Sequence, residues 1–431
     1  MNTLRIGIIG FGTVGSGVVE CIQNNADLMA ERTDVRLVVA RVADKDLESD
    51  RGVTLEDGVL VSDVSAVLDA DDIDVVVELV GGTTVAKDFV LRALQAGKPV
   101  VTANKALLAE YGRELFDAAE TAGTDLYYEA SVGGGIPVIK AIREGLVANR
   151  ITEIIGILNG TCNYILTRME AEKAAFEPIL SEAQQLGYAE ADPGLDVDGI
   201  DTAHKAVILA ALGYGEWFGM APCYVEGIRG IELQDIEYAT ALGYRIKLLA
   251  VIKQQQQNVQ IRVHPALVHC ETMLANVSDV FNAVWVRGDT VDGTLYYGRG
   301  AGREATASAV VADIMDIGLN LKRNAVRRIP AFRPHKGYDR ITRMEDVEVR
   351  YYLSLQAVDR PGVLASISGI LGDSNIGIAS VTQHEVEQES VPVVILTHKA
   401  RERDLRSALT QVAALPEITD TPVFIRIEDM D

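Results

Sequence analysis

The chain has 431 residues, a length that usually forms two or three domains. Hydrophobic residues make up 48% and charged residues 24%, as in ordinary globular proteins, which excludes an intrinsically disordered chain. The 62 acidic residues outnumber the 40 basic ones, giving a formal net charge of -22. This balance excludes proteins that bind a nucleic-acid backbone through a basic surface, although a local loop can still bind a small anionic cofactor.

The cysteines and the N-terminus indicate the cellular compartment. The cysteines are widely spaced, with no C-x-x-C pair and no Cys/His cluster at zinc spacing: Cys21, Cys162, Cys223 and Cys270. We therefore expect neither a disulfide framework nor structural zinc, which is typical of a reducing cytoplasm. The first residues lack the features of a signal peptide, and no apolar run reaches the roughly 18 residues of a membrane span. We expect a soluble, cytoplasmic protein with no nucleic-acid or membrane partner.

Residues 1–133 alternate between short apolar runs and helical stretches. The runs at 4–9, 35–42, 74–80 and 99–102 read as buried strands, and helices are expected up to residue 31 and over 84–96 and 105–122. This alternation predicts an α/β fold with a doubly wound parallel sheet of the Rossmann type.

The rest of the chain predicts two further domains. Residues 134–301 mix helices and strands as in an α+β domain. A helix over 302–318 is expected to pack back on the first domain, and the polar stretch 319–348 reads as a linker. Residues 349–431 follow the β-α-β-β-α-β order of a ferredoxin-like unit. Within the α+β domain, helices are expected over 137–147, 160–171, 174–187 and 199–212, and strands over 151–158, 244–253 and 259–268, with a hairpin tip at Gln254–Gln257.

A glycine-rich turn follows the first strand and opens a helix. It reads Gly10-Phe11-Gly12-Thr13-Val14-Gly15 and fits G-x-G-x-x-G in the context that supports dinucleotide binding. The first glycine permits a tight turn, the second lets backbone approach a pyrophosphate, and the third lets helix and strand pack closely. The alternative is a glycine turn without a ligand.

The end of the second strand bears on the choice between NAD and NADP. Arg41 and Lys45 could bind a 2′-phosphate, whereas Asp44 could bind a ribose hydroxyl. We favour NADP(H), with NAD(H) as a second possibility. The alternative is that Arg41 is an exposed charge at the end of the strand.

Lysines and acids are the candidates for proton transfer. Lys105 follows the fourth predicted strand, at the edge where open α/β sheets bind ligands. Asp201 and Lys205 stand four residues apart at the start of a predicted helix, so they share one face. The alternative is a solvated acidic loop followed by an ordinary ion pair.

Seven segments together resemble the homoserine dehydrogenase family over nearly the whole chain. They are G-F-G-T-V-G at 10–15, E-L-V-G-G at 78–82, A-N-K-A-L-L-A at 103–109, E-A-S-V-G-G-G-I-P at 129–137, L-N-G-T-C-N-Y-I-L at 158–166, G-Y-A-E-A-D-P at 187–193 and D-G-I-D-T-A-H-K at 198–205. The resemblance implies NAD(P)-dependent interconversion of L-homoserine and L-aspartate 4-semialdehyde, on the route to threonine, methionine and isoleucine.

The resemblance also implies roles for individual residues. Lys205 would be the general acid and base, and Lys105 would lie between cofactor and substrate. Glu190 and Asp201 would hold the amino group or hydroxyl of homoserine, supported by Asp196. Two glycines, Gly187 and Gly302, are further expected cofactor contacts.

The segment over 129–137 has three successive glycines followed by a proline. Carbonyl oxygens in such an irregular turn suit hard cations. The resemblance implies a monovalent cation, typically sodium, held by the backbone of four residues: Glu129, Val132, Gly134 and Ile136. The alternative is a hinge between domains.

The C-terminal turn D-R-P-G-V-L-A at 359–365 resembles that of ACT domains, which sense amino acids. Such domains pair, and loop 359–363 would face residues 375–378 of a partner, implying a homodimer or homotetramer with allosteric control. Threonine is the expected effector, with isoleucine or methionine as fallback, and the alternative is a purely structural dimerisation unit. The expected effector contacts are Asp359, Gly362, Val363, Asn375 and Ile378.

Two other functions remain open at this point. A non-catalytic sensor of dinucleotides and amino acids could keep the same folds, but the presence of Lys105, Glu190, Asp201 and Lys205 favours an enzyme. A nucleophilic Cys162 would suit aspartate-semialdehyde dehydrogenase, although no histidine base is near it in sequence.

Overall fold

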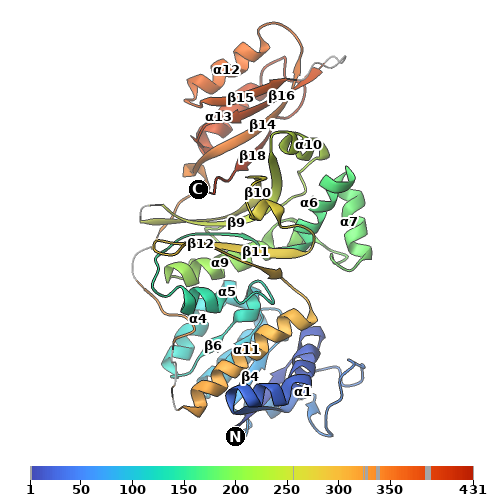
Figure 1. Ribbon diagram of the computed structural model, residues 1–431, viewed down its shortest axis with the longest axis vertical. Helices are drawn as coiled ribbons and strands as arrows, with labels where there is room; N and C mark the ends of the chain where they lie inside the picture. The colour runs from blue at the N-terminus through green and yellow to red at the C-terminus, as the bar shows by residue number, and fades with distance from the viewer. Residues whose placement is uncertain are drawn as a thin grey trace. The chain divides into compact units, whose positions relative to one another are not determined.

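The computed structural model describes residues 2–255, 257–323, 325, 329–335, 340–383 and 390–430. The chain forms two compact units. The first contains residues 1–160, 201–221 and 281–339, and the second contains residues 161–200, 222–280 and 340–431. Figure 1 gives the element labels used below.

A parallel sheet of six strands forms the base of the first unit, in the order β3-β2-β1-β4-β5-β6. This confirms the predicted doubly wound α/β fold. Because its strands are covered on both faces, side chains such as Ile6, Ile8 and Val101 are fully buried. The strands are β1 (Asn2–Ile9), β2 (Val35–Ala43), β3 (Leu60–Val61), β4 (Val75–Glu78), β5 (Val100–Thr102) and β6 (Leu126–Tyr127), and the helices between them are α1 (Thr13–Thr33), α2 (Ser65–Leu68), α3 (Thr84–Gln95) and α4 (Lys105–Thr121).

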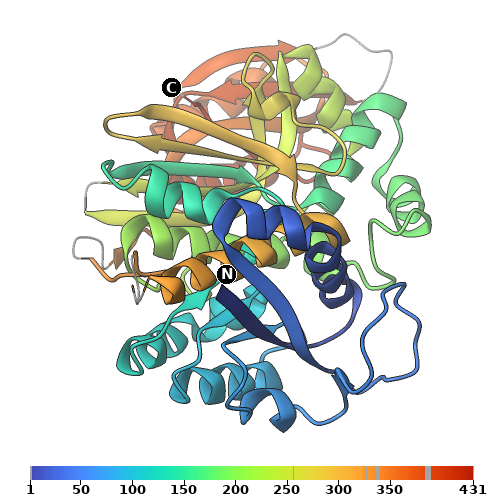
Figure 2. The ribbon, with the colours of Figure 1, turned by 60° about the horizontal axis from the view of Figure 1, so that its bottom comes forward.

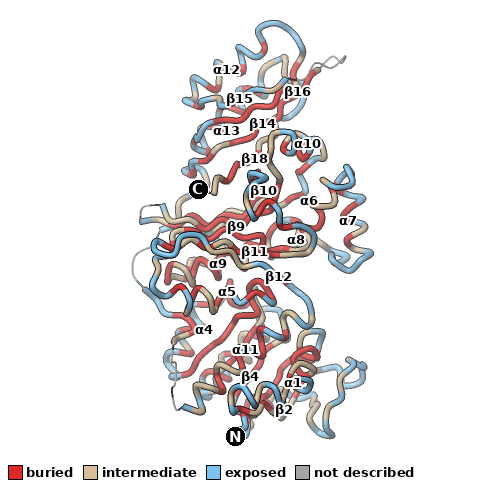
Figure 3. The backbone as a smooth tube through the Cα atoms, in the orientation of Figure 1, coloured by how far each residue is buried: buried red, intermediate tan, exposed pale blue. Residues whose placement is uncertain are grey.

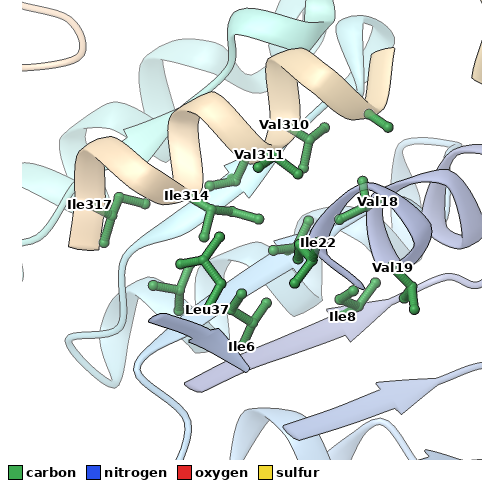
Figure 4. Packing of buried hydrophobic residues seen from close by; sticks show 14 of the residues in the cluster. Ile6, Ile8, Val18, Val19, Ile22, Leu37, Val310, Val311, Ile314 and Ile317 are labelled. Carbon is green, nitrogen blue, oxygen red and sulfur yellow. The ribbon is translucent and has the colours of Figure 1, made fainter. Parts of the chain in front are cut away.

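Helix α11 (Arg303–Lys322) packs against α1 although it comes far later in the chain, as Figures 1 and 2 show. Figure 4 shows Val310 and Ile314 of α11 beside Val18 and Ile22 of α1. All four belong to one buried hydrophobic cluster that also includes strand residues of the sheet. The predicted return of this helix to the dinucleotide-binding sheet is confirmed.

The first unit also holds elements that the sequence did not indicate. Strands β11 (Phe281–Gly288) and β12 (Asp292–Arg299) form an antiparallel hairpin, and β11 pairs with β7 (Ile151–Ile157). The remaining elements of this unit include α9 (Ile200–Tyr214), whose first residue belongs to the second unit, the turn η1 (Glu129–Ser131), α5 (Val138–Lys140) and η2 (Ala141–Gly145).

The helix predicted near 137–147 is present, as α5 followed directly by the π-helical segment η2. The carboxylate of Glu129 accepts the backbone N–H groups of Ile139 (2.9 Å) and Lys140 (2.7 Å). The N–H of Leu146 then bonds to the carbonyl of Ala141 (2.9 Å), which closes a wider, π-type turn. The Glu129 carboxylate thus caps the start of this helix, and helical periodicity alone does not predict the change to π geometry.

The second unit is built on a mixed sheet with the order β9-β10-β18-β14-β16-β15. Its C-terminal part runs β14, α12, β15, β16, α13, β18, which confirms the predicted ferredoxin-like order. The expected hairpin is present, with Asn258 paired to Gln255, and Gln256 lies outside the described residues. The strands are β8 (Tyr224–Val225), β9 (Tyr244–Gln255), β10 (Asn258–His269), β13 (Arg340–Ile341), β14 (Glu348–Val358), β15 (Ile378–Gln383), β16 (Ser390–Thr397), β17 (Ala400–Arg401) and β18 (Val423–Ile427), and the helices are α6 (Gly160–Glu172), α7 (Phe176–Gln185), α8 (Gly194–Val197), α10 (Leu233–Ala241), α12 (Val363–Asp373) and α13 (Glu402–Ala413), with short turns η3 (Leu274–Asn276) and η4 (Met344–Asp346).

Many strand residues are buried, as the colouring of the chain in Figure 3 shows. Alternation is weak along the central strands, because both faces are covered. Among the described residues, no helix combines the length and apolar character needed to cross a membrane.

Candidate functional site

The glycine-rich turn lies at one wall of a cavity of about 700 Å³ at the carboxyl ends of β1, β2 and β4. Gly10 has a φ of 100°, and a Cβ there would lie 2.7 Å from the backbone of Leu79. At Gly15 a Cβ would lie 2.2 Å from the carbonyl oxygen of Gly10. Gly12 lines the cavity and faces open space, so a pyrophosphate can approach its backbone.

The remaining residues of the turn continue into α1. Phe11 is buried, and its backbone N–H donates to the carboxylate of Asp44 at 2.5 Å. Thr13 and Val14 form the first turn of the helix, behind Gly12 at the N-cap position. A helix N-terminus that faces a cavity is suited to bind phosphate.

The charged residues after β2 separate into two groups. Asp44 and Lys45 line the cavity. The guanidinium of Arg41 instead pairs with Asp72 at 3.2 Å, and Asp72 also pairs with Arg5 at 2.7 Å. The structure therefore does not bring Arg41 to the cavity with Lys45, because its charge is satisfied elsewhere. Lys45 is the lysine available to a ribose phosphate.

Three charged side chains meet beyond the end of β5. Lys105 is the first residue of α4, and its ammonium lies 3.0 Å from Oδ1 of Asp201. Lys205 lies one turn after Asp201 on α9 and donates to its Oδ2 at 2.7 Å. The Lys205 and Asp201 side chains are 9% and 11% exposed, whereas that of Lys105 is 40% exposed. One carboxylate thus holds two ammonium groups, and one of these reaches solvent.

Two neighbours complete this cluster and were missed by the sequence reasoning. The Lys205 ammonium donates to the carbonyl of Leu158 at 2.6 Å, and the amide of Asn159 donates to Oδ2 of Asp201 at 3.0 Å. Both residues lie in the segment L-N-G-T-C, but a backbone carbonyl and a neutral amide give no charge signal in a sequence. The cluster is therefore fixed by β7 and its following turn as well as by α4 and α9.

Burial alone would raise the pKa of Asp201. The ammonium groups of Lys205 and Lys105 outweigh burial and hold that pKa below its ordinary range. Burial lowers the pKa of the adjacent His204, which keeps its imidazole neutral at neutral pH. The low pKa keeps the Asp201 carboxylate ionised near pH 7.

The other substrate-binding candidates lie in the second unit. Glu190 is exposed, and its backbone carbonyl accepts a hydrogen bond from Gln184 at 3.0 Å. Asp196 lies in α8 and is partly buried, and its carbonyl accepts from the thiol of Cys162 at 3.2 Å. Gly187 has a φ of 75° in the turn after α7. Because the Cys162 side chain is fully buried, it is not accessible as a nucleophile.

The turn at 129–136 is suited to hold a cation through backbone oxygens. The carbonyls of Glu129 and Ile136 each accept one N–H, from Val132 (3.4 Å) and Val138 (2.8 Å), which leaves each a second lone pair. Gly134 has a φ of 52°. Among the described residues, no group of three or more His, Cys, Asp or Glu side chains could hold a metal ion.

Buried carboxyl groups lie beside this turn. The carboxylate of Asp313 accepts the backbone N–H of Glu129 at 2.8 Å. Burial raises the pKa of Glu129 to about 7 and raises that of Asp313 well above its usual range. The backbone oxygens of this buried turn, with the Glu129 and Asp313 carboxyl groups nearby, fit a hard, singly charged cation.

The remaining predicted cofactor and effector contacts lie near the start of α11 and near the two ends of α12. Gly302 caps α11 with a φ of 124°. Gly362 caps α12 with a φ of 98°, and Asn375 adopts a φ of 57° before β15. Asp359 lies in the loop before Gly362, Val363 begins α12, and Ile378 begins β15. Those five ACT positions are thus distributed around both ends of α12.

Comparisons with known proteins agree with this organisation. The sequence matches the family models of homoserine dehydrogenase over residues 137–315, of the homoserine dehydrogenase NAD binding domain over 10–129, and of the ACT domain over 351–417. It is 44% identical to a homoserine dehydrogenase of Neisseria gonorrhoeae over 434 residues, which span 100% of both chains. The chain belongs to the homoserine dehydrogenase family. A solved homoserine dehydrogenase from Thiobacillus denitrificans, 44% identical, has a TM-score of 0.94, with 100% of this chain and 99% of that chain covered.

The homoserine dehydrogenase family assignment makes the chain an oxidoreductase with a dinucleotide-binding domain and an ACT domain. A hyperthermophilic archaeal homoserine dehydrogenase solved in complex with NADPH is 27% identical, with a TM-score of 0.63 over 74% of this chain and 98% of that chain. The family assignment and the burial of Cys162 remove support from an aspartate-semialdehyde dehydrogenase.

Proposed function

We propose that the protein interconverts L-homoserine and L-aspartate 4-semialdehyde in the cytoplasm, for threonine, methionine and isoleucine biosynthesis. The single observation that carries this proposal is the cluster of Lys105, Asp201 and Lys205, with one ammonium group on each carboxylate oxygen. Alcohol oxidation needs a group that accepts the hydroxyl proton, and aldehyde reduction needs the same group to return it.

Lys205 is the proposed general acid and base. Its ammonium has three N–H groups, of which two are used by the carbonyl of Leu158 and the carboxylate of Asp201. The third is free to donate to the aldehyde oxygen. Asp201 keeps its negative charge at neutral pH, because the two ammonium groups hold its pKa low. A bound nicotinamide ring supplies or accepts the hydride.

The proposed substrate ligands are Glu190, Asp196, Asp201 and Lys105. Carboxylates suit the amino group of homoserine, and an ammonium group suits its carboxylate or hydroxyl. Glu190→Ala is expected to raise the KM for homoserine more than it lowers kcat. An unchanged KM in steady-state kinetics would exclude this role for Glu190.

NADP(H) is the proposed preferred cofactor, with NAD(H) as the alternative. Lys45 supports the 2′-phosphate, since it lines the cavity, whereas Arg41 is paired with Asp72. The test is a matched pair of variants. Lys45→Ala should raise the KM for NADPH more than that for NADH, while Arg41→Ala should leave the ratio unchanged. A wild-type enzyme that prefers NADH would contradict the proposal.

A monovalent cation, typically sodium, is proposed at the backbone oxygens of four residues: Glu129, Val132, Gly134 and Ile136. Its support is the oxygen-only donor set of this buried turn. Replacing sodium by choline should lower the midpoint of thermal unfolding, with recovery on adding sodium back. An unfolding midpoint independent of sodium would reject the site.

The ACT domain is proposed to bind threonine at a seam between two copies, within a homodimer or homotetramer. Gly362→Asp should desensitise the enzyme, because a side chain strains the φ of 98° at this position. Gly369, on α12 with open space around it, offers Gly369→Ala as a control. Truncation after about residue 340 would also remove β18, which pairs with β10, so the point variant Gly362→Asp is the test of desensitisation.

One assay tests the central proposal. Homoserine oxidation is followed with NADP and with NAD, in the absence and presence of millimolar threonine. We expect turnover with a preference for NADP and inhibition by threonine. No turnover with either cofactor would favour a non-catalytic sensor, and turnover without inhibition would leave the ACT domain a structural role.

A further inference from the structure

The loop after β4 is held by a buried carboxylate. Glu78, the last residue of β4, is fully buried, and its Oε1 accepts the backbone N–H groups of Val80 (2.9 Å) and Gly81 (3.3 Å). Its Oε2 accepts the hydroxyl of Thr102 at 2.7 Å, across the neighbouring strand β5. Burial of an ionisable carboxyl is unfavourable unless hydrogen bonds replace its hydration, and these three donors supply them.

The same hydroxyl connects this loop to α4. The oxygen of Thr102 accepts the backbone N–H of Asn104 at 3.0 Å. The side chain of Asn104 then makes two bonds: its amide donates to the carbonyl of Gly82 at 2.7 Å, and its oxygen accepts the N–H of Leu107 at 3.1 Å. Asn104 is thereby the N-cap of α4, whose first residue is Lys105.

Together these hydrogen bonds form a closed ring that runs from Glu78 through loop 80–82, Asn104 and Thr102 back to Glu78. The ring lies between the dinucleotide cavity and Lys105. Residues 80–82 line the dinucleotide cavity, and Gly81 and Gly82 have φ values of 77° and 70°. Lys105, on the other side of the ring, pairs with Asp201 at 3.0 Å. The backbone of loop 80–82 is thus hydrogen-bonded both to the end of β4, through Glu78, and to the N-cap of α4, through Asn104.

We propose that Glu78, Thr102 and Asn104 are positioning residues that join the cofactor-cavity loop to Lys105. The cofactor, when seated on residues 80–82, then fixes where the Lys105 ammonium lies relative to Asp201. The proposal rests on the proposed function for the role of Lys105, but its link between loop and helix is independent of the substrate.

The decisive variant is Thr102→Val, which removes the connecting hydroxyl with almost no change in volume. Thr102 is fully buried, so its hydroxyl has no contact with solvent, and the Tm together with the control variant separates loss of stability from loss of the ring. The matched control is Thr397→Val in the second unit. Thr397 is also fully buried, and its hydroxyl oxygen accepts a backbone N–H, from Tyr351 at 3.0 Å.

Three measurements distinguish a positioning role of Thr102 from a purely structural role. Calorimetric titration gives the Kd of NADPH without homoserine, steady-state kinetics give kcat and its pH profile, and thermal unfolding gives the Tm. Both variants should lower Tm. Only Thr102→Val should also weaken NADPH binding, shift the pH profile of kcat and lower kcat. The expected loss of kcat is roughly 10- to 100-fold, because small misplacements of reacting groups have effects of this size. The proposal is overturned if Thr102→Val changes Tm alone, as Thr397→Val should.

A second variant covers the case in which Thr102→Val does not fold. Asn104→Ser keeps an N-cap hydroxyl for α4 but is too short to bond both Leu107 and Gly82. We expect a nearly unchanged Tm with lower kcat and weaker NADPH binding. Wild-type kcat and Kd in this variant would also overturn the proposal. If the wild-type enzyme does not oxidise homoserine, the proposed function fails, whereas the NADPH titrations still decide whether the ring shapes the cofactor cavity.

Discussion

Two clusters of buried charge, one in each compact unit, are arranged for different tasks. In the first unit, Asp201 pairs with Lys105 and Lys205, and one of these ammonium groups is 40% exposed. In the second unit, Arg426 of β18 is fully buried against Glu402, which is 1% exposed. Both clusters remove charges from water, which is favourable only when partners replace the lost hydration.

The formal charges in the cluster around Arg426 are balanced. Its guanidinium donates to Glu402 of α13 at 2.9 and 2.5 Å, to Glu226 at 2.7 Å and to the hydroxyl of Tyr224 at 3.1 Å. Arg406 adds a second bond to Glu402 at 2.7 Å. Two positive and two negative charges are thereby matched across β18, α13 and the segment that begins at β8.

The two clusters differ in whether their formal charges cancel. Around Asp201 there is one positive charge more than negative charge, and a path to solvent through Lys105. Around Arg426 the formal charges cancel. Burial and ion pairing are common to both, so neither identifies a functional site by itself. An unmatched charge distinguishes the proposed catalytic cluster from the cluster around Arg426.

Lys205→Ala should separate activity from stability most sharply. It removes the proposed general acid and base, which would accept the hydroxyl proton, so kcat for homoserine oxidation should fall by roughly 10²- to 10⁴-fold. The midpoint of thermal unfolding should change little, because Lys105 still pairs with Asp201. Steady-state kinetics and calorimetry check both outcomes, and a variant that retains most of its kcat would show that Lys205 is not the acid or base.

Arg426→Met should show the opposite pattern. Loss of the guanidinium leaves the carboxylate of Glu402 buried without its main partner, which should lower the free energy of unfolding by about 3–5 kcal/mol. In the double variant Arg426→Met/Glu402→Gln part of this loss should be recovered, since the buried charge is also removed. Urea unfolding measures these differences. A single variant as stable as the wild type would mean that this cluster does not hold the second unit together.

Lys247 offers an intermediate case, a buried ammonium that bonds to neutral oxygens. It donates to the side-chain oxygen of Asn163 at 3.1 Å and to the carbonyl of Val277 at 2.6 Å, and burial lowers its pKa to about 8. Because the unfolded chain holds this proton more tightly, stability should rise between about pH 8 and pH 10.5, by up to roughly 3 kcal/mol. Lys247→Met should flatten this part of the stability curve. An identical pH dependence in both proteins would contradict the shifted pKa.

Asn159→Ala should give the smallest effect. It removes one hydrogen bond to the Asp201 carboxylate, and such a bond contributes roughly 1.5 kcal/mol, or about tenfold in kcat if lost in the transition state. Asn163 on α6, which belongs to the second unit, provides a comparable amide for the control variant Asn163→Ala. If both variants lower kcat equally, the bond from Asn159 has no special role in the cluster.

The sequence predicted the charged partners of the site but not the neutral groups that hold them. Lys105, Asp201 and Lys205 were identified because charge and spacing are visible in a sequence. The roles of Leu158, Asn159 and Thr102 depend on which strands lie side by side, and a carbonyl or hydroxyl becomes specific only in that context.

The same reasoning explains where the fold was predicted well. Buried parallel strands and the ferredoxin-like order leave strong apolar patterns. The pairing of Arg41 with Asp72 depends on a side chain distant in sequence. Long-range contacts of this kind override local propensity.

The packing of α11 on α1 has a consequence for synthesis on the ribosome. The cluster that joins Val310 and Ile314 to Ile8 and Val18 is incomplete until the last of these residues has left the exit tunnel. Translation adds ~5–20 residues per second, so the strands of residues 1–133 are synthesised on the order of ten to forty seconds before that helix. During this interval an apolar face is open to chaperones and to aggregation. An N-terminal fragment that ends at residue 133 would therefore expose this face permanently.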